Sequence, residues 1–142
     1  MSRIALTNMF FGFLAIIIAS LGGFFLASDA NKAFLINREL LQSWEYTLMK
    51  SAHGHLNLFG ILHILMGLTM PYSVSSKTIH IAQSIGLGLG TLTMGILMFF
   101  RARLNIPQGS DLLGIVIGVL LMTALCALGL HSYGLLRKVL AR

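Results

Sequence analysis

Histidine and asparagine side chains interrupt one apolar stretch of the chain, between Lys50 and Pro71. The polar residues in question are His53, His55, Asn57 and His63. Ionisable side chains inside a membrane are costly to bury, so each of them indicates a function. Histidine is also the commonest metal ligand among the side chains. The stretch therefore predicts a membrane helix that holds a metal cofactor.

The spacing of the histidines limits how they can act together. His53 and His55 are two residues apart, which is about 200° of rotation on a helix, so they cannot chelate one ion and instead present imidazoles on two sides. His63 lies eight residues beyond His55, about 12 Å along the helix axis, and cannot share an iron with either. A second axial ligand must therefore come from another helix or from another subunit.

The depth of other residues in the expected bundle suggests candidates for that second ligand. His131, on the last helix, lies near the level of His63, so the two can face each other, with His80 nearer the headgroups. Met94 and Met98 lie near the level of His53 and His55. A His/Met haem, an open coordination position or a ligand from a neighbouring protomer are all compatible with this placement.

The composition identifies a membrane protein. Hydrophobic residues make up 56% of the 142 residues and charged residues only 10%, whereas about a quarter of residues are charged in soluble domains. The net charge of +6 comes from Lys and Arg at the ends of apolar runs, as expected for anchoring in a lipid bilayer. The cations form no basic patch with interleaved aromatic residues, which excludes a nucleic-acid-binding surface.

The apolar runs predict one domain, an all-α integral membrane bundle. Each run has the length of a membrane span, and the short connections after the second run imply antiparallel neighbours in an up-down four-helix bundle. A mixed apolar and polar segment over about 30–44 predicts a short interfacial helix, and 105–109 a turn. The expected transmembrane helices cover about 4–27, 46–70, 79–100 and 112–136.

Small residues indicate where these helices approach one another. Ala82, Gly86 and Gly90 recur at four-residue spacing, as do Gly114 and Gly118. Such patterns allow close packing of membrane helices. Asp111 precedes the last run, where a helix N-terminus favours a negative charge.

The distribution of Lys and Arg does not by itself orient the chain. Five of these cations fall on each side of the expected bundle, counted from the expected spans, and acidic residues contribute little to the positive-inside rule. We expect both termini on the cytoplasmic side of a bacterial inner membrane.

The sequence Ala52-His53-Gly54-His55, followed by Leu56-Asn57-Leu58-Phe59-Gly60, resembles the His-x-His helix of haem–copper oxidase subunit I, and most closely its nitric oxide reductase branch. The resemblance implies that His53 holds a high-spin haem and that His55 holds a low-spin haem. It covers about twenty residues, and the chain lacks the His-His pair and the tyrosine partner of that family's copper site. The resemblance thus implies haem binding, without oxygen or nitric oxide reduction by this chain alone.

The sequence therefore predicts a membrane protein that binds haem b for electron transfer or for binding a diatomic gas. It acts with a separate redox partner and as a homo-oligomer, either a dimer or a trimer; if it is an enzyme, it is an oxidoreductase. Two alternatives remain open: a protein that handles copper or another metal and uses the same histidines with Met94 and Met98, and a cofactor-free subunit or assembly factor of a respiratory complex. The expected metal ligands are His53, His55, His63 and His131, and the expected cofactor-binding residues add Gly54, Asn57 and Met94.

Overall fold

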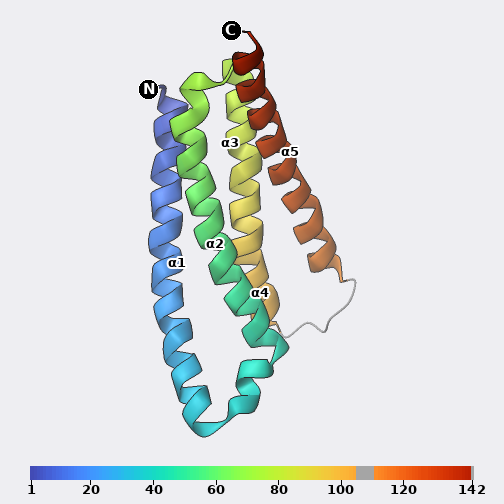
Figure 1. Ribbon diagram of the computed structural model, residues 1–142. Coiled ribbons are helices and arrows are strands. Elements are labelled where there is room, and N and C mark those ends of the chain that lie inside the picture. The colour runs from blue at the N-terminus through green and yellow to red at the C-terminus, as the bar shows by residue number, and fades with distance from the viewer. Residues whose placement is uncertain (105–110, 142) are drawn as a thin grey trace.

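The computed structural model describes residues 1–104 and 111–141, which are almost entirely helical and include no strand. In chain order the elements are α1 (Arg3–Ile36), the 3-10 helix η1 (Arg38–Gln42), α2 (Trp44–Thr69), the 3-10 turn η2 (Met70–Tyr72), α3 (Lys77–Thr91), the π-helix η3 (Leu92–Leu97), α4 (Met98–Arg103) and α5 (Leu112–Leu140). α3, η3 and α4 continue one another as one rod beside α1, α2 and α5, and both termini lie at the same end (Figure 1). We call this end the upper end. The predicted turn over 105–109 lies outside the described residues.

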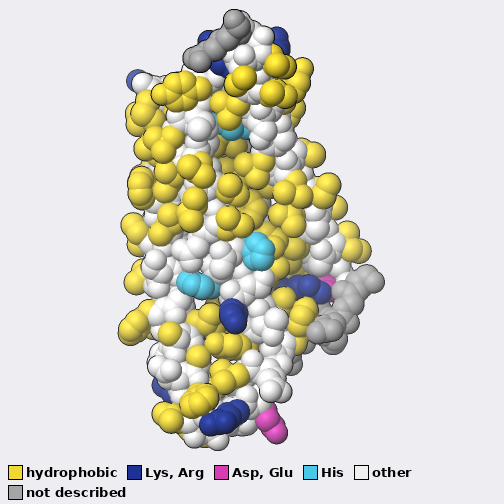
Figure 2. All heavy atoms as spheres, in the orientation of Figure 1, with side chains coloured by type: hydrophobic (Ala, Val, Ile, Leu, Met, Phe, Trp, Pro, Cys, Tyr) yellow, Lys and Arg dark blue, Asp and Glu magenta, His cyan; other side chains and the backbone are white. Residues whose placement is uncertain are grey.

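Three of the described helices are long and apolar enough to cross a membrane: α1, the rod Lys77–Arg103, and α5. This confirms the predicted class of helical membrane protein. α2 has 26 residues but is not among them, because its histidines, Asn57 and Lys50 lower its hydropathy. Hydrophobic side chains cover most of the face shown in Figure 2, and histidine side chains reach the surface over α2 in the middle of that face.

The first helix is longer than the sequence predicts. We expected it to end near residue 27 and a separate interfacial helix to follow over 30–44, but α1 continues to Ile36 and only the five residues of η1 follow it. Between Ala27 and Ile36 the chain has neither proline nor glycine, so no residue there opposes the helix. Leu26 and Ala33 are buried, and this packing continues along the extension.

Small residues bring α1 and α2 close together. A Cβ atom added to Gly12 would lie 2.5 Å from the carbonyl oxygen of Gly60, and one added to Gly60 would lie 2.9 Å from that of Gly12. About two turns beyond Gly60 on α2, a Cβ atom added to Gly67 would lie 2.6 Å from the carbonyl oxygen of Ala5. Backbone atoms cannot move aside as side chains do, so this interface depends on glycine at these positions.

The predicted stripe of small residues on α3 packs inside the chain. Cβ atoms added to Gly86 and Gly90 would lie 2.9 Å and 2.5 Å from Ala127 and Ala124 of α5. Ala82 is exposed, and Gly118 has no neighbour within 4 Å of its added Cβ, so these two do not join the interface. The glycine positions of this stripe are therefore largely covered by α5 and are not free for contacts between copies of the chain.

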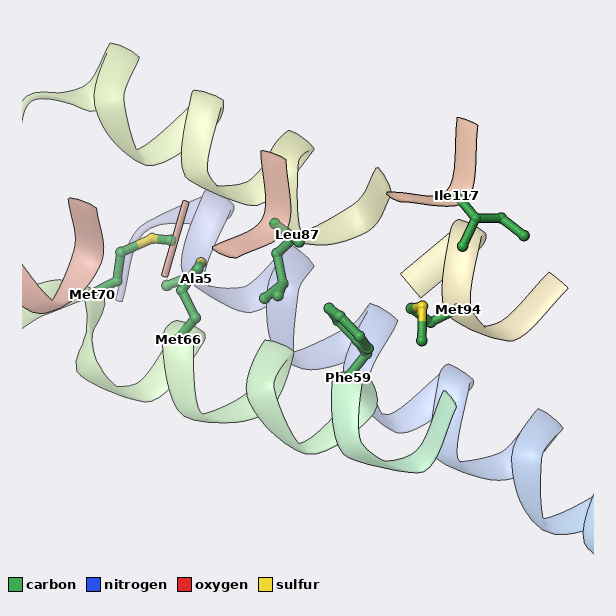
Figure 3. Packing of buried hydrophobic residues seen from close by; sticks show 8 residues of the cluster. Ala5, Phe59, Met66, Met70, Leu87, Met94 and Ile117 are labelled. Carbon is green, nitrogen blue, oxygen red and sulfur yellow. The ribbon is translucent and has the colours of Figure 1, made fainter. Parts of the chain in front are cut away.

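The core of the bundle is apolar and contains the methionine that we expected near the haem. Met94 lies between Phe59 and Ile117, in a cluster of buried residues that extends to Met66 and Leu87 (Figure 3). The residue is 6% exposed. Packing fully accounts for this methionine, since methionine is a common filler of irregular core space.

Asp111 begins α5 as predicted. Its side chain accepts a hydrogen bond from the backbone N–H of Gly114 at 2.7 Å and forms an ion pair with Arg101 at the end of α4. The N–H of Gly114, and then Arg101, hold the pKa of this carboxyl below its usual value. The same side chain thus caps α5 and ties it to α4.

Replacing Asp111 with asparagine is expected to lower the thermal stability of the detergent-solubilised protein at pH 7, and to lower it progressively less as the pH falls below about 3.9. Asparagine retains the cap but loses the ion pair. Because the pKa of Asp111 is lower in the folded protein, its contribution is fully present above the unfolded pKa of about 3.9 and is lost as the pH falls through the folded pKa. Thermal unfolding from pH 7 to pH 3 measures this. A difference between the two proteins that is constant over this range contradicts the prediction.

Candidate functional site

His53 lies on the side of α2 that faces α1. Its Nδ1–H donates to the backbone carbonyl oxygen of Ala19 at 2.9 Å, which fixes the proton on Nδ1 and leaves the lone pair on Nε2. The ring packs over Gly23, whose added Cβ would lie 2.5 Å from Cε1 of His53. A histidine that is held in this way at Nδ1 has the tautomer that a metal ligand requires at Nε2.

His55 lies on the other side of α2, as its spacing from His53 predicts. Its Nδ1–H donates to the carbonyl oxygen of Ser51 at 2.8 Å, and the hydroxyl of Ser51 lies 3.2 Å away. Among the described residues its Nε2 has no hydrogen-bond partner. The side chain is only half-buried, so this lone pair is accessible from the membrane side of α2.

Asn57 and Gly54 lie beside the two histidines. The amide nitrogen of Asn57 donates to the carbonyl oxygen of His53 at 3.2 Å and lies 3.5 Å from Nε2 of the same residue. Asn57 therefore bonds within α2 and makes at most a weak contact with the candidate ligand atom. Gly54 is exposed and has nothing within 4 Å of its added Cβ, so no neighbouring helix packs against α2 at this position.

His63 is buried in a network that joins three helices. Its Nδ1–H donates to Oδ1 of Asn8 on α1 at 2.9 Å, and its Nε2 lies 3.1 Å from the hydroxyl of Thr91 on α3. The amide nitrogen of Asn8 in turn donates to Ile4 O and to the hydroxyl of Ser84, at 3.0 Å and 2.7 Å. Both ring nitrogens of His63 thus lie within hydrogen-bond distance of side chains on neighbouring helices, and the single hydroxyl proton of Thr91 is shared between Nε2 and the carbonyl oxygen of Leu87. This is the arrangement of a histidine that holds helices together.

His131 is engaged in the same manner at the upper end of the bundle. Its Nδ1–H donates to Oε1 of Gln83 at 3.4 Å, and its Nε2 lies 2.8 Å from the hydroxyl of Thr69. His131 and His63 therefore do not face each other across one iron. His80 lies near the start of α3, where its Nε2 and the amide nitrogen of Gln83 are buried without a partner among the described residues.

A cavity of about 300 Å³ lies beside His53, between α1, α2 and the η3–α4 part of the rod. Its walls are almost entirely apolar and include Gly95 and Ile96 of the π-helix and Phe99 of α4. π-Helical segments are rare and occur frequently at functional sites. Met94 and Met98 do not line this cavity, so neither methionine faces His53 through it.

Among residues 1–104 and 111–141, no group of three or more His, Cys, Asp or Glu side chains gathers to hold a metal ion. A bare ion coordinated mainly by such side chains is therefore not supported within the described part of a single chain. A haem needs only one or two protein ligands, because the porphyrin supplies the other donors. The arrangement of the histidines on α2 is compatible with haem as the metal centre.

The hydrogen-bond partners that distinguish His53 from His63 were not among the residues that the sequence pointed to. Ala19 accepts from His53 through its backbone, and Asn8 and Thr91 engage His63. Asn8 could have been identified from the sequence, since it is a polar residue within an otherwise apolar membrane span. The backbone carbonyl of Ala19 could not have been identified in this way, because every residue has one.

Replacing Asn8 with leucine is expected to lower the free energy of unfolding by about 1–3 kcal/mol, because the buried Nδ1–H of His63 then lacks its acceptor. The double replacement of Asn8 and His63 by leucine should be less destabilising than the sum of the single changes, since it removes both partners. Unfolding of the protein in mixed micelles measures all three variants. Strict additivity shows that the pair does not interact.

No family model, no curated protein and no solved structure matches this chain. The candidate site consequently stands on the geometry of its own residues.

Proposed function

We propose that this protein binds haem b through the imidazoles of α2 and serves in electron transfer or in binding a diatomic gas. One observation carries the proposal. His53 and His55 each donate Nδ1–H to a backbone carbonyl, whereas both ring nitrogens of His63 and His131 are engaged. Of the four histidines that the sequence suggests as ligands, the structure thus favours the His-x-His pair.

The surroundings of His53 fit a haem. The cavity beside it is apolar, and its volume is at the lower end of the range of about 300–1,000 Å³ for cofactor and ligand sites. Haem would supply a one-electron iron centre at this position. The chain would orient the imidazole through Ala19, exclude water by means of Phe99 and Ile96, and set the potential of the iron by burial.

We further propose that α2 is a fourth membrane span. It packs along most of α1, which is itself apolar enough to span. It begins at Trp44, and Tyr72 follows it at the end of η2, which are residue types enriched at membrane interfaces. Both termini would then lie on one side of the membrane, which we assign to the cytoplasm of a bacterial cell.

Self-association completes the proposed site. His55 is half-buried near the middle of α2, and its Nε2 has no hydrogen-bond partner among the described residues. Most homo-oligomers have cyclic symmetry, so a dimer or trimer that brings α2 faces together would cover this histidine and supply a second ligand. Electron transfer would also require a redox partner outside the chain.

The visible spectrum of the detergent-purified protein, from cells supplied with a haem precursor, tests the proposal. Haem b is expected to appear as a Soret band with α and β bands on reduction, and a pyridine haemochrome assay quantifies it. A colourless protein with bound copper supports the copper-handling alternative. A colourless and metal-free protein refutes haem binding and leaves the histidines as interhelical hydrogen-bonding residues.

A further inference from the structure

A second and larger cavity lies between α1 and α3, away from His55. It is a groove of about 620 Å³ with α2 as its floor, and it extends along α1 from Arg3 to Ile18. Fifteen residues of helix correspond to about 22 Å. The groove is thus long and narrow, and it follows the helix axes over most of the roughly 30 Å of a hydrocarbon core.

The walls of the groove are apolar side chains, such as Phe11 and Leu14 on α1 and Ile85 on α3. Gly88 of α3 also lines it and has nothing within 4 Å of its added Cβ. α1 and α3 approach each other here without the close glycine contacts that join α1 to α2. The space between them is therefore left for another apolar group.

The polar groups at the floor of the groove already bond to one another. Asn8, His63 and Thr91 line it, and their hydrogen bonds run within the network described above. An apolar chain that covers these residues leaves no donor or acceptor newly unpaired. A ligand that requires hydrogen bonds inside the groove would have to break this network.

The mouth of the groove is positively charged. Arg3 lines it, and none of the ion pairs among the described residues involves Arg3. All four acidic residues of the chain, Asp29, Glu39, Glu45 and Asp111, belong to the lower end, whereas the upper end carries Lys77, Arg137 and Lys138 in addition to Arg3 (Figure 1). The N-termini of α1 and α3 add their positive dipole ends there.

We propose that this groove binds one acyl chain of an anionic amphiphile, whose phosphate or carboxylate group pairs with Arg3. The apolar walls and the satisfied floor fit the chain, and the unopposed positive charge at the mouth fits the head group. Two sources share this chemistry, an anionic membrane phospholipid and a free fatty acid. The groove shares Ile18, Leu56 and Ile96 with the cavity beside His53, but binding of an acyl chain in it does not require haem.

Native mass spectrometry of the delipidated full-length protein tests the proposal, with phosphatidylglycerol, phosphatidylcholine of the same chains, and oleate as probes. Phosphatidylglycerol or oleate is expected to bind in a defined one-to-one complex, and which of the two binds more tightly identifies the source. Phosphatidylcholine should bind at least about fivefold more weakly, and Arg3→Gln should weaken binding of the anionic probe about fivefold, the effect of one cation near a membrane surface.

Gly88→Phe provides the second arm, because it fills the groove without meeting any neighbouring atom at Cβ. It is expected to abolish the one-to-one complex. Gly118→Phe on α5 is the matched control, since Gly118 is also free of neighbours but lies outside the groove. Equal binding of both phospholipids, or complexes that persist unchanged in Gly88→Phe, would overturn the proposal.

Discussion

Replacing both His53 and His55 with alanine is expected to remove all bound haem from the purified protein. These are the two histidines of α2 whose Nε2 is available, since Nδ1–H of each donates to a backbone carbonyl, that of Ala19 or of Ser51. Without them the described chain offers only imidazoles whose nitrogens are engaged or, for His80, lie near the start of α3. The pyridine haemochrome assay per mole of protein measures the loss.

The single variants separate the roles of the two histidines. The resemblance to haem–copper oxidases implies that His55 ligates a low-spin haem, so His55→Ala should abolish the low-spin spectrum. His80→Ala should leave it intact. Retention of the low-spin spectrum in His55→Ala together with its loss in His80→Ala would show that the ligands lie at the upper end of the bundle instead.

His63→Ala and His131→Ala serve as controls for a purely structural effect. Each removes a hydrogen-bonding imidazole that is at most 6% exposed, so each should lower the stability of the bundle. Neither should lower the haem content of the protein that remains folded. If either variant loses haem while its thermal stability is unchanged, that histidine is a ligand and the assignment to the His-x-His pair is wrong.

Replacing Gly12 or Gly60 with alanine is expected to separate α1 from α2 and to lower the free energy of unfolding by about 1–3 kcal/mol, the usual cost of overpacking. The added methyl group at either position would lie 2.5–2.9 Å from a backbone carbonyl oxygen of the facing helix. Because both obstacles are backbone atoms, a rotamer change cannot relieve the contact. Unfolding in mixed micelles of increasing denaturing detergent measures the change.

Gly22→Ala is the matched control for this prediction. Gly22 lies on the same helix as Gly12 but has nothing within 4 Å of its added Cβ, so alanine there should be neutral or stabilising through its higher helix propensity. Equal loss of stability in Gly22→Ala and Gly12→Ala would show that the close approach of α1 and α2 is not what glycine provides. The same separation would disrupt the hydrogen bond from His53 to Ala19, so haem content should fall in Gly12→Ala as well.

The sequence by itself determines the class of the protein and the positions of its long helices. Runs of apolar residues with Lys and Arg at their ends predict membrane helices, and the structure places helices over all of the expected spans. Asp111 as the cap of α5 was also predictable, because capping depends on residues within one turn of the helix end. The histidine-rich stretch identified α2 as the helix in which function is to be sought.

Only the tertiary structure decided which histidines have a free ring nitrogen. The partners of His53 and His63 lie 34 and 55 residues away in the chain, so spacing within α2 contains no information about them. They are set by the rotation of α1 against α2, which in turn depends on the fit of Gly12 to Gly60. A periodic pattern predicts which residues share a helix face, but the bonds of an imidazole depend on which backbone and side-chain atoms the neighbouring helix brings within 3 Å or so.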